Sequence, residues 1–217
     1  SEPCTAVLSP SPLGCTEVTL TRVGVAGTFG ISYTDSLGNW MFDNSAIVLP
    51  AGDYSFTAIA RDAAGNLSAV TAPFNVTIDT TAPAINSAPL LELADDTGLA
   101  GDLLTKFRQP RLTGNVFDNL PAVQVQIFRE ADVLANDFSD PLGTATAAAN
   151  GSYVVQVDAI HALANGSHTV RILATDAAGN PAISPSLTFT VDATPPTVES
   201  FCTPTATTPC PTSPVTV

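Results

Sequence analysis

One pentapeptide, Asp-Ala-Ala-Gly-Asn, occurs twice in this chain, at Asp62–Asn66 and at Asp176–Asn180. Each copy follows a run of alternating apolar and polar residues. Each is followed by a second such run, which ends in Asp and a Thr/Pro-rich joint. A strand, a tight Gly-Asn turn, a second strand and a joint make one supersecondary unit, and this unit recurs at an offset of 114 residues, from Asp62 to Asp176. A repeat of this length predicts a tandem array of modules.

The composition indicates short strands and many turns. The 217 residues include 18 Pro and 14 Gly, while aromatic residues make up only 6% and charged residues only 12%. A net charge of −13 with seven Lys and Arg residues argues against nucleic acid and anionic membranes as partners, because both bind cationic surfaces. The same charge suits divalent cations. No apolar run approaches the length of a membrane-spanning helix.

The runs between the turns predict short strands in both halves of the chain. In residues 1–80 we expect strands at Glu17–Val23, Thr28–Thr34, Asn39–Phe42, Ser45–Leu49, Tyr54–Arg61 and Ala72–Ile78. In residues 81–193 we expect them at Pro89–Leu93, Arg111–Phe117, Val123–Arg129, Gly143–Ala148, Ser152–Val157, Ser167–Thr175 and Ser186–Asp192. Seven short strands with regular turn signals are typical of an immunoglobulin-like sandwich. The predicted fold is therefore all-β, with tandem immunoglobulin-like antiparallel β-sandwiches, and Trp40 is expected to anchor the first core.

The first module lacks counterparts of the first two strands of the second. When the two pentapeptides are aligned, Glu17–Val23 falls opposite Val123–Arg129. Nothing in the first module then corresponds to Pro89–Leu93 or Arg111–Phe117. We therefore expect three parts: an incomplete module at 1–80, a complete module at 81–193, and a tail at 194–217 that begins or complements another module.

The tail resembles the missing beginning of the first module. It holds two short β-like pieces, Thr197–Phe201 and Ser213–Val217, where a third module would begin. Residues 194–217 and 1–80 together amount to 104 residues, close to the 113 of the complete module. The candidates for strand donation are Val198, Phe201, Val215 and Val217.

Two situations would produce this arrangement. In the first, the sequence is an excerpt of a longer array, cut inside two modules. In the second, the tail of one chain supplies strands to the incomplete module of the next, because an open sandwich exposes unpaired backbone edges and apolar core that an added strand satisfies. Such a head-to-tail contact does not close on itself and generates a filament of copies of the same chain.

Four cysteines occur as two close pairs, Cys4 with Cys15 and Cys202 with Cys210, in segments rich in Pro, Ser and Thr. Wide spacings and the lack of a nearby His argue against a zinc site and favour disulfides, which form in an oxidising, extracellular compartment. Four cysteines allow three connectivities, and the sequence does not choose among them. In a strand-donated module all four would lie together, where an interchain disulfide could lock the joint.

Two strings, Ala174–Asn180 and Leu187–Pro196, resemble bacterial Ig-like repeats of large surface adhesins. The acidic segment Leu93–Gly98, followed by Gly101 and Asp102, is similar to the acidic loop near the start of those repeats. The resemblance covers the second module fully and the second half of the first. It implies an extended stalk that projects a binding tip from the cell and is often rigidified by calcium. Cysteine-containing loops are unusual for that family and point to a different export route or a filament subunit.

Carboxylates are the ligands that Ca²⁺ prefers, and it takes about six to eight oxygens. The candidate ligands are Asp79, Asp95, Asp96, Asp102, Asp176 and Asp192. Alternating strands would place Asp176 at the end of the second module where the joint with Asp79 enters, beside the loop Phe117–Asn119. The others would lie at the opposite end, where three carboxylates within eight residues, at Asp95, Asp96 and Asp102, repel one another without a cation. Turn chemistry is the alternative for Asp62 and Asp176, since Asp and Asn cap turns.

No catalytic machinery is visible in the sequence. Asp96-Thr97-Gly98 matches the triplet of aspartic proteases, but those enzymes need two triplets across a cleft, and the chain has no second one. The two histidines, His161 and His168, form no metal-binding motif, and no nucleophile elbow or phosphate loop is present.

We therefore predict a non-enzymatic structural module of a bacterial cell-surface or extracellular fibre. Its expected partners are neighbouring copies of itself or adjacent Ig-like modules, and the sequence identifies no host ligand. One alternative is an excerpt of a calcium-rigidified adhesin stalk. Another is a ligand-binding adhesin module, which would need an aromatic-lined patch that is hard to build from three Tyr and one Trp.

Overall fold

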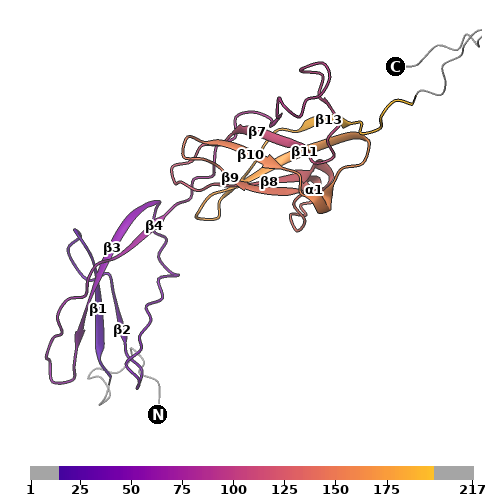
Figure 1. Cartoon of the computed structure of the whole chain (residues 1–217). Coiled ribbons are helices and arrows are strands. Elements are labelled where there is room, and N and C mark those ends of the chain that lie inside the picture. Colours follow the sequence, from indigo (N-terminus) through magenta and orange to yellow (C-terminus); the bar gives the residue numbers. More distant parts are fainter. Residues whose placement is uncertain (1–14, 198–217) are drawn as a thin grey trace, which may run out of the picture. The chain divides into compact units, whose positions relative to one another are not determined.

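The computed structural model describes residues 15–197 of the chain (Figure 1). It divides the chain into two compact units, Ser1–Thr80 and Thr81–Val217, hereafter unit 1 and unit 2. Both units are built almost wholly from antiparallel strands. The predicted all-β class is thus confirmed.

Unit 1 contains one four-stranded antiparallel sheet. Its strands are β1 (Glu17–Arg22), β2 (Gly30–Tyr33), β3 (Gly52–Arg61) and β4 (Phe74–Ile78), in the spatial order β2-β1-β3-β4. Because side chains alternate across a strand, the register puts apolar residues on one face and mainly polar residues on the other. Leu20 lies opposite Ala58, Phe56 opposite Phe74, and Tyr54 opposite Val76 on the apolar face.

Unit 2 contains two sheets. The smaller sheet has the order β10-β7-β5 and consists of β5 (Leu90–Leu91), β7 (Arg111–Asn115) and β10 (Ser152–Gln156). The larger sheet has the order β6-β13-β11-β8-β9 and consists of β6 (Leu104–Thr105), β8 (Gln124–Arg129), β9 (Gly143–Thr146), β11 (Gly166–Thr175) and β13 (Leu187–Val191), with β12 (Pro181–Ile183) paired to β11. The helix α1 (Glu130–Leu134) and the short 3-10 turn η1 (Ala159–His161) complete the unit.

The core of unit 2 lies between these two sheets. The larger sheet contributes alternate residues that are almost fully buried, among them Ile127, Ile172 and Phe189. The smaller sheet contributes Leu112 and Val155 to the same cluster. Aliphatic burial of this kind contributes about 25 cal/mol for each Å² of apolar surface removed from water, and it is the main stabilising force of the unit.

The four strands of the unit 1 sheet match four strands of the larger sheet of unit 2. The order β2-β1-β3-β4 matches the order β9-β8-β11-β13. The registers also agree, since Leu20 pairs with Ala58 as Ile127 pairs with Ile172, and Phe56 with Phe74 as Val170 with Leu187. Within residues 15–80, however, no strands correspond to the smaller sheet of unit 2.

Two of the predicted strands are wrong, and several elements were missed. Residues 39–42 and 45–49 form no strand. The first of these aligns with β10, which is hydrogen-bonded to β7, and the described part of unit 1 offers no such partner. The prediction that Trp40 anchors a core is also wrong, because 43% of this residue is exposed. The sequence-based expectation did not include β6, β12 or α1.

The equivalent positions Leu187 and Phe74 should differ sharply in their effect on stability. Leu187 is 7% exposed and Phe74 is 69% exposed. We expect Leu187→Ala to lower the free energy of unfolding of unit 2 by about 2–5 kcal/mol, and Phe74→Ala to change that of unit 1 by no more than about 0.5 kcal/mol. Urea unfolding followed by circular dichroism, with Trp40 fluorescence as the reporter of unit 1, measures both. Similar losses at the two sites would contradict this assignment of the core.

Candidate functional site

The repeated pentapeptide forms the same turn in both units. In unit 2, Oδ1 of Asp176 accepts hydrogen bonds from the backbone N–H groups of Ala178 at 2.9 Å and Asn180 at 2.8 Å, and Oδ2 accepts from Asn180 Nδ2 at 2.8 Å. The turn at Asp62 in unit 1 has the same three bonds. In each turn the Gly has a positive φ, which side chains disfavour. Turn chemistry therefore accounts for the motif by itself.

The copy in unit 2 has a second carboxylate beside it. Asp176 is 6% exposed, and one of its carboxylate oxygens lies within 4.8 Å of an oxygen of Asp118. Oδ2 of Asp118 accepts a hydrogen bond from the backbone N–H of Leu120 at 2.8 Å, whereas its Oδ1 is buried and has no hydrogen-bond partner. A buried acceptor without a donor is costly, and a cation would satisfy it.

Electrostatics favours the charged form of Asp176. Burial raises the pKa of Asp176, but hydrogen bonds from the side chain and backbone of Asn180, and then from Ala178 and Gly179, lower it by more, so the pKa lies below its ordinary value. An ionised carboxylate this close to a second one creates a negative site that attracts a cation. The pair Asp118 and Asp176 is therefore the candidate metal centre of unit 2.

Sequence reasoning placed the loop that carries Asp118 at this end of the module but did not count Asp118 as a ligand. The signal was its position directly after β7, in a loop that the strand alternation brings beside the Asp176 turn. Asp79 follows β4 directly and is half-buried. It precedes unit 2 by two residues, and the carbonyl of Thr81, the first residue of unit 2, accepts from Asn180 Nδ2 at 3.5 Å.

The other predicted ligands are engaged in different ways. Asp95 is buried and accepts hydrogen bonds from three nitrogens of Arg111: the backbone N at 2.7 Å, Nε at 3.0 Å and Nη2 at 2.7 Å. The guanidinium thus supplies the positive charge that this carboxylate requires. Burial alone raises the pKa of Asp95, but the hydrogen bonds and charge of Arg111 hold it below its ordinary value.

The remaining acids of that end bind their own loops. Oδ2 of Asp96 accepts from the backbone N–H of Gly101 at 2.5 Å, while its Oδ1 is buried without a hydrogen-bond partner. Asp102 accepts from Leu104 N at 2.9 Å. Among the described residues, Asp95, Asp96 and Asp102 do not form a group whose oxygens all lie within 4.8 Å of one another. Asp192 caps the joint after β13, accepting from Thr194 N at 3.0 Å and Asn165 Nδ2 at 3.4 Å.

Most of the other predicted site residues lie outside the described part of the chain. This holds for Cys4, Cys202 and Cys210 and for the strand-donation residues Val198, Phe201, Val215 and Val217. Cys15 is buried just before β1 and is not free. The pairing of the cysteines and the donation of strands therefore stay predictions.

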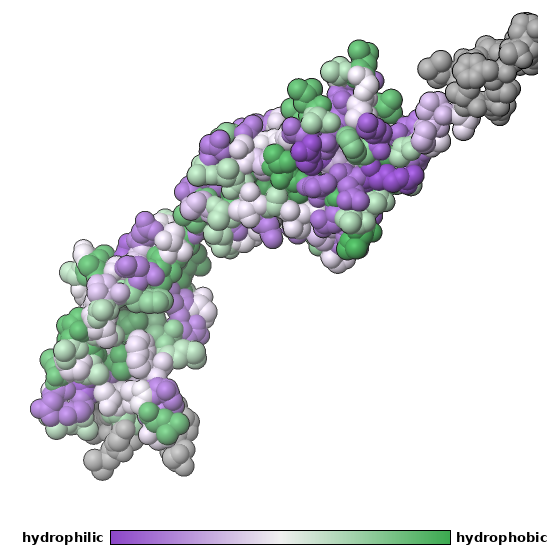
Figure 2. Space-filling view, in the orientation of Figure 1, coloured by the Kyte–Doolittle hydropathy of each residue, from purple (hydrophilic) through white to green (hydrophobic). Residues whose placement is uncertain are grey.

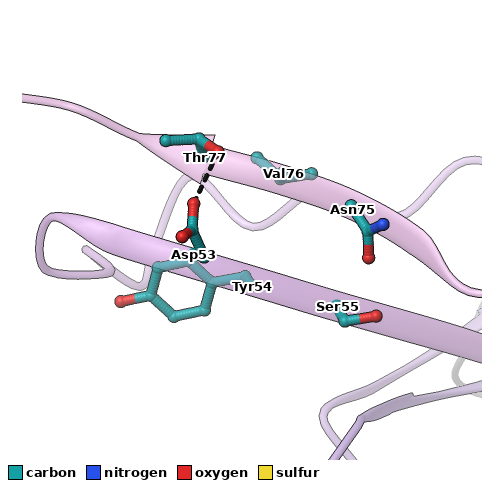
Figure 3. A pocket seen from close by; sticks show the side chains of 6 residues that line it. All are labelled: Asp53, Tyr54, Ser55, Asn75, Val76 and Thr77. Atoms are coloured by element: carbon teal, nitrogen blue, oxygen red, sulfur yellow. Dashed lines mark hydrogen bonds between the residues drawn. The ribbon is translucent and has the colours of Figure 1, made fainter. Parts of the chain in front are cut away.

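A depression of about 300 Å³ lies over the β3–β4 pair of unit 1 (Figure 3). It is lined by Asp53, Tyr54, Ser55, Asn75, Val76 and Thr77. The carboxylate of Asp53 accepts a hydrogen bond from the Thr77 hydroxyl at 2.6 Å. One carboxylate held by a hydroxyl does not make an acid–base pair of the kind that hydrolytic enzymes use.

The chain belongs to the bacterial Ig-like domain family, whose model matches residues 13–80 and 83–193. The resemblance seen in the sequence is thereby confirmed, and so are tandem Ig-like modules. No curated protein matches the chain. In the described residues, no helix has the length and apolar character needed to cross a membrane.

Several solved structures resemble the chain. A tetra-tandem repeat from the extending region of a large adhesion protein is 25% identical, with a TM-score of 0.36, over 84% of this chain and 42% of that one. The fibronectin(III)-like modules of Clostridium thermocellum CbhA are 13% identical, with a TM-score of 0.44, over 86% of this chain and 82% of that one. A Ca²⁺-stabilised, ice-binding adhesin of an Antarctic bacterium is 20% identical, with a TM-score of 0.34, over 84% and 41%. The chain thus spans less than half the length of both adhesin structures.

Replacing Asp95 with Asn should destabilise unit 2 because it removes the charge that Arg111 binds. We expect a loss of about 2 kcal/mol in the free energy of unfolding at neutral pH. A carboxylate with a lowered pKa stabilises the fold above its ordinary pKa of 3.8 and loses this effect as the pH falls through the folded value. The difference between wild type and Asp95→Asn should therefore shrink in acid, as urea unfolding across pH will show.

The matched control is Asp102→Asn, since Asp102 is exposed and its carboxylate accepts a hydrogen bond from the backbone N–H of Leu104. It should change stability by no more than about 0.5 kcal/mol at any pH. An equal loss in both variants, or a loss for Asp95→Asn that does not depend on pH, would contradict the role assigned to the Asp95–Arg111 pair.

Proposed function

We propose that this chain is a non-catalytic structural segment of a bacterial cell-surface or extracellular fibre, in which Ig-like modules follow one another end to end. The observation that carries the proposal is the pair of consecutive family matches, which leave only residues 81 and 82 between them. Modules that follow one another with so short a linker suit a stalk or fibre built from repeats.

The chemistry of the chain supports an extracellular setting. Seven Lys and Arg residues against twenty Asp and Glu give a surface that stays apart from anionic membranes and nucleic acids. Four cysteines in a Pro- and Thr-rich context suit disulfides and an oxidising compartment. Strand donation from residues 194–217 to the next copy is the proposed means of stacking, and the cysteines would then lie within one joint.

We expect calcium to bind beside the Asp176 turn and to stabilise unit 2. Asp118 and Asp176 offer carboxylate oxygens close to one another, and Asp118 Oδ1 lacks a hydrogen-bond donor. Asp79, which the sequence also predicts as a ligand, lies two residues before Thr81 in the chain. Backbone carbonyls and water would complete the oxygen set that Ca²⁺ takes. The expected affinity is that of extracellular modules, with Kd of roughly 10⁻⁴ to 10⁻³ M.

Calcium should raise the melting temperature of unit 2 and not that of unit 1. At about ten times a Kd of roughly 10⁻³ M, binding adds about 1.4 kcal/mol and raises Tm by roughly 5 °C. Differential scanning calorimetry in calcium and in EDTA measures the shift. Asp118→Asn should abolish it, whereas the control Asp62→Asn, at the position of unit 1 equivalent to Asp176, should leave it unchanged. A shift that survives Asp118→Asn would disprove the site.

The structural role can be tested by locating the protein on cells and by assaying the protein for sugar binding. Antibodies raised against unit 2 should label the outside of intact producing cells in immunogold micrographs. The purified chain should bind no sugar on a glycan array. Specific sugar binding that is lost when Tyr54 or Asn75 is replaced would favour the alternative, a ligand-binding adhesin module. A label found only inside the cells would contradict the proposal.

A further inference from the structure

The tetrapeptide Ala-Asn-Gly-Ser occurs twice in unit 2, at Ala149–Ser152 and at Ala164–Ser167. In an Asn-Gly pair the backbone nitrogen of Gly can attack the side-chain amide of Asn, because Gly has no side chain that hinders the approach. The intrinsic reactivity of such a pair depends on its neighbours in the sequence, and these are the same in both copies. Any difference in reactivity between Asn150 and Asn165 is therefore set by the fold.

The fold shields the first copy, which lies in the turn before β10. Gly151 is buried, and its N–H donates to the carbonyl of Ala148 at 2.8 Å. Its own carbonyl accepts from the N–H of Val116 at 2.9 Å. Oδ1 of Asn150 accepts only from uncharged donors, the N–H of Ser152 at 3.1 Å and its hydroxyl at 2.8 Å. The nitrogen that would attack is thus bonded and enclosed.

The second copy is open to water. Asn165 and Gly166 are exposed, and the space where a Cβ of Gly166 would lie is empty to 4 Å. Gly166 begins β11 and pairs with Val191 in the last rung of the β11–β13 ladder. Only this terminal rung has to open for the Gly166 nitrogen to turn toward Asn165, and ladder ends open at little cost. Figure 2 shows a largely hydrophilic surface where the chain leaves unit 2.

The side-chain amide of Asn165 is held by groups that favour the attack. Its Oδ1 accepts hydrogen bonds from Nη2 of Arg108 at 3.2 Å and from the N–H of Ala193 at 3.2 Å. Negative charge builds up on this oxygen when a nitrogen attacks Cγ, and two donors, one of them cationic, stabilise that charge as an oxyanion hole does. The leaving group Nδ2 lies 2.5 Å from Oγ1 of Thr194 and 3.4 Å from Oδ1 of Asp192.

From these contacts we propose that Asn165 is a site of spontaneous deamidation, which the fold of unit 2 promotes. The nitrogen of Gly166 loses its proton to solvent and forms a bond to Cγ of Asn165. The Cγ–Nδ2 bond then breaks, and Nδ2 takes a proton from water through the Thr194 hydroxyl and leaves as ammonia. Water opens either carbonyl of the resulting cyclic imide and leaves aspartate or isoaspartate. The net reaction consumes one water and releases one ammonia, and it does not rest on the structural role proposed above.

The modification loosens the joint after β13. The product loses the Nδ2 group that donates to Thr194 and Asp192, and it places a second carboxylate beside that of Asp192. Like charges this close repel one another. Isoaspartate also lengthens the main chain by one atom at the start of β11. The aligned position of unit 1 is Ala51, so the amide that holds this joint is a feature of unit 2.

The two copies of the tetrapeptide test the proposal within one sample. The whole chain is incubated in mildly alkaline buffer, and peptide mapping by mass spectrometry follows the deamidated fraction at each Asn over time. In the folded chain Asn165 should react at least about tenfold faster than Asn150, because only its amide has an oxyanion-stabilising cation beside it. In concentrated urea the two rates should be equal. Equal rates in the folded chain, or a faster reaction at Asn150, would overturn the proposal.

Arg108→Met separates the oxyanion contact from a merely structural one. It should slow the reaction at Asn165 about tenfold, whereas the loss of a residue that only held the joint in place would speed the reaction up. Lys106→Met removes the same charge from a neighbouring exposed residue and should leave the rate unchanged. Circular dichroism establishes that both variants are folded. A faster reaction in Arg108→Met, or equal slowing in Lys106→Met, contradicts the proposal.

The effect on the joint is measured separately. Ion exchange separates the deamidated chain from the unmodified chain, and amide hydrogen exchange is then compared between the two. Exchange in residues 192–197 should be faster in the deamidated chain, whereas the strands of unit 1 should exchange as before. Unchanged exchange in residues 192–197 would show that the modification does not loosen the joint.

Discussion

The stability of this fold depends on the burial of one apolar sheet face beneath a second sheet. A strand pair alone satisfies half of its backbone groups and leaves one face of its side chains in water. In unit 2 the apolar face is buried between two sheets, which enclose a continuous core of mainly aliphatic residues with few aromatic side chains. Unit 1 uses the same strand order and register for its single sheet. Within residues 15–80, no second sheet covers the apolar face of that sheet.

Much of this architecture could be predicted from the sequence, because strand alternation and turn residues are local signals. The strands from β1 to β4 and the longer strands of unit 2 follow such runs. Residues 39–42 carry the same local signal but form no strand, since strand formation also needs a partner and that partner is distant in the sequence. The two-residue β6 pairs in parallel with β13 and is too short to leave a periodic pattern. Pairings of this type are set by the tertiary fold.

In the candidate site too, local features could be predicted from the sequence, whereas contacts between distant residues could not. The Asp-Ala-Ala-Gly-Asn turn is readable from five residues because all of its hydrogen bonds are internal. The partners that decide the chemistry of each carboxylate are distant in the sequence and cannot be read in this way. Asp118, which lies beside Asp176, comes 58 residues before it, and Arg111, the partner of Asp95, comes 16 residues after it. Composition indicated cation binding, but it could not show that a guanidinium already neutralises Asp95 while a buried oxygen of Asp118 lacks a donor.

The position of β13 between β6 and β11 has a mechanical consequence. A tension that leaves unit 2 through Asp192 acts along the axis of β13, while the hydrogen bonds to both neighbours run across that axis. Under such a load the bonds are sheared together, because none can open until the whole strand slides. A strand loaded from its end by peeling would lose its bonds one at a time and yield at a lower force. The arrangement thus resists extension of unit 2 along the axis of β13.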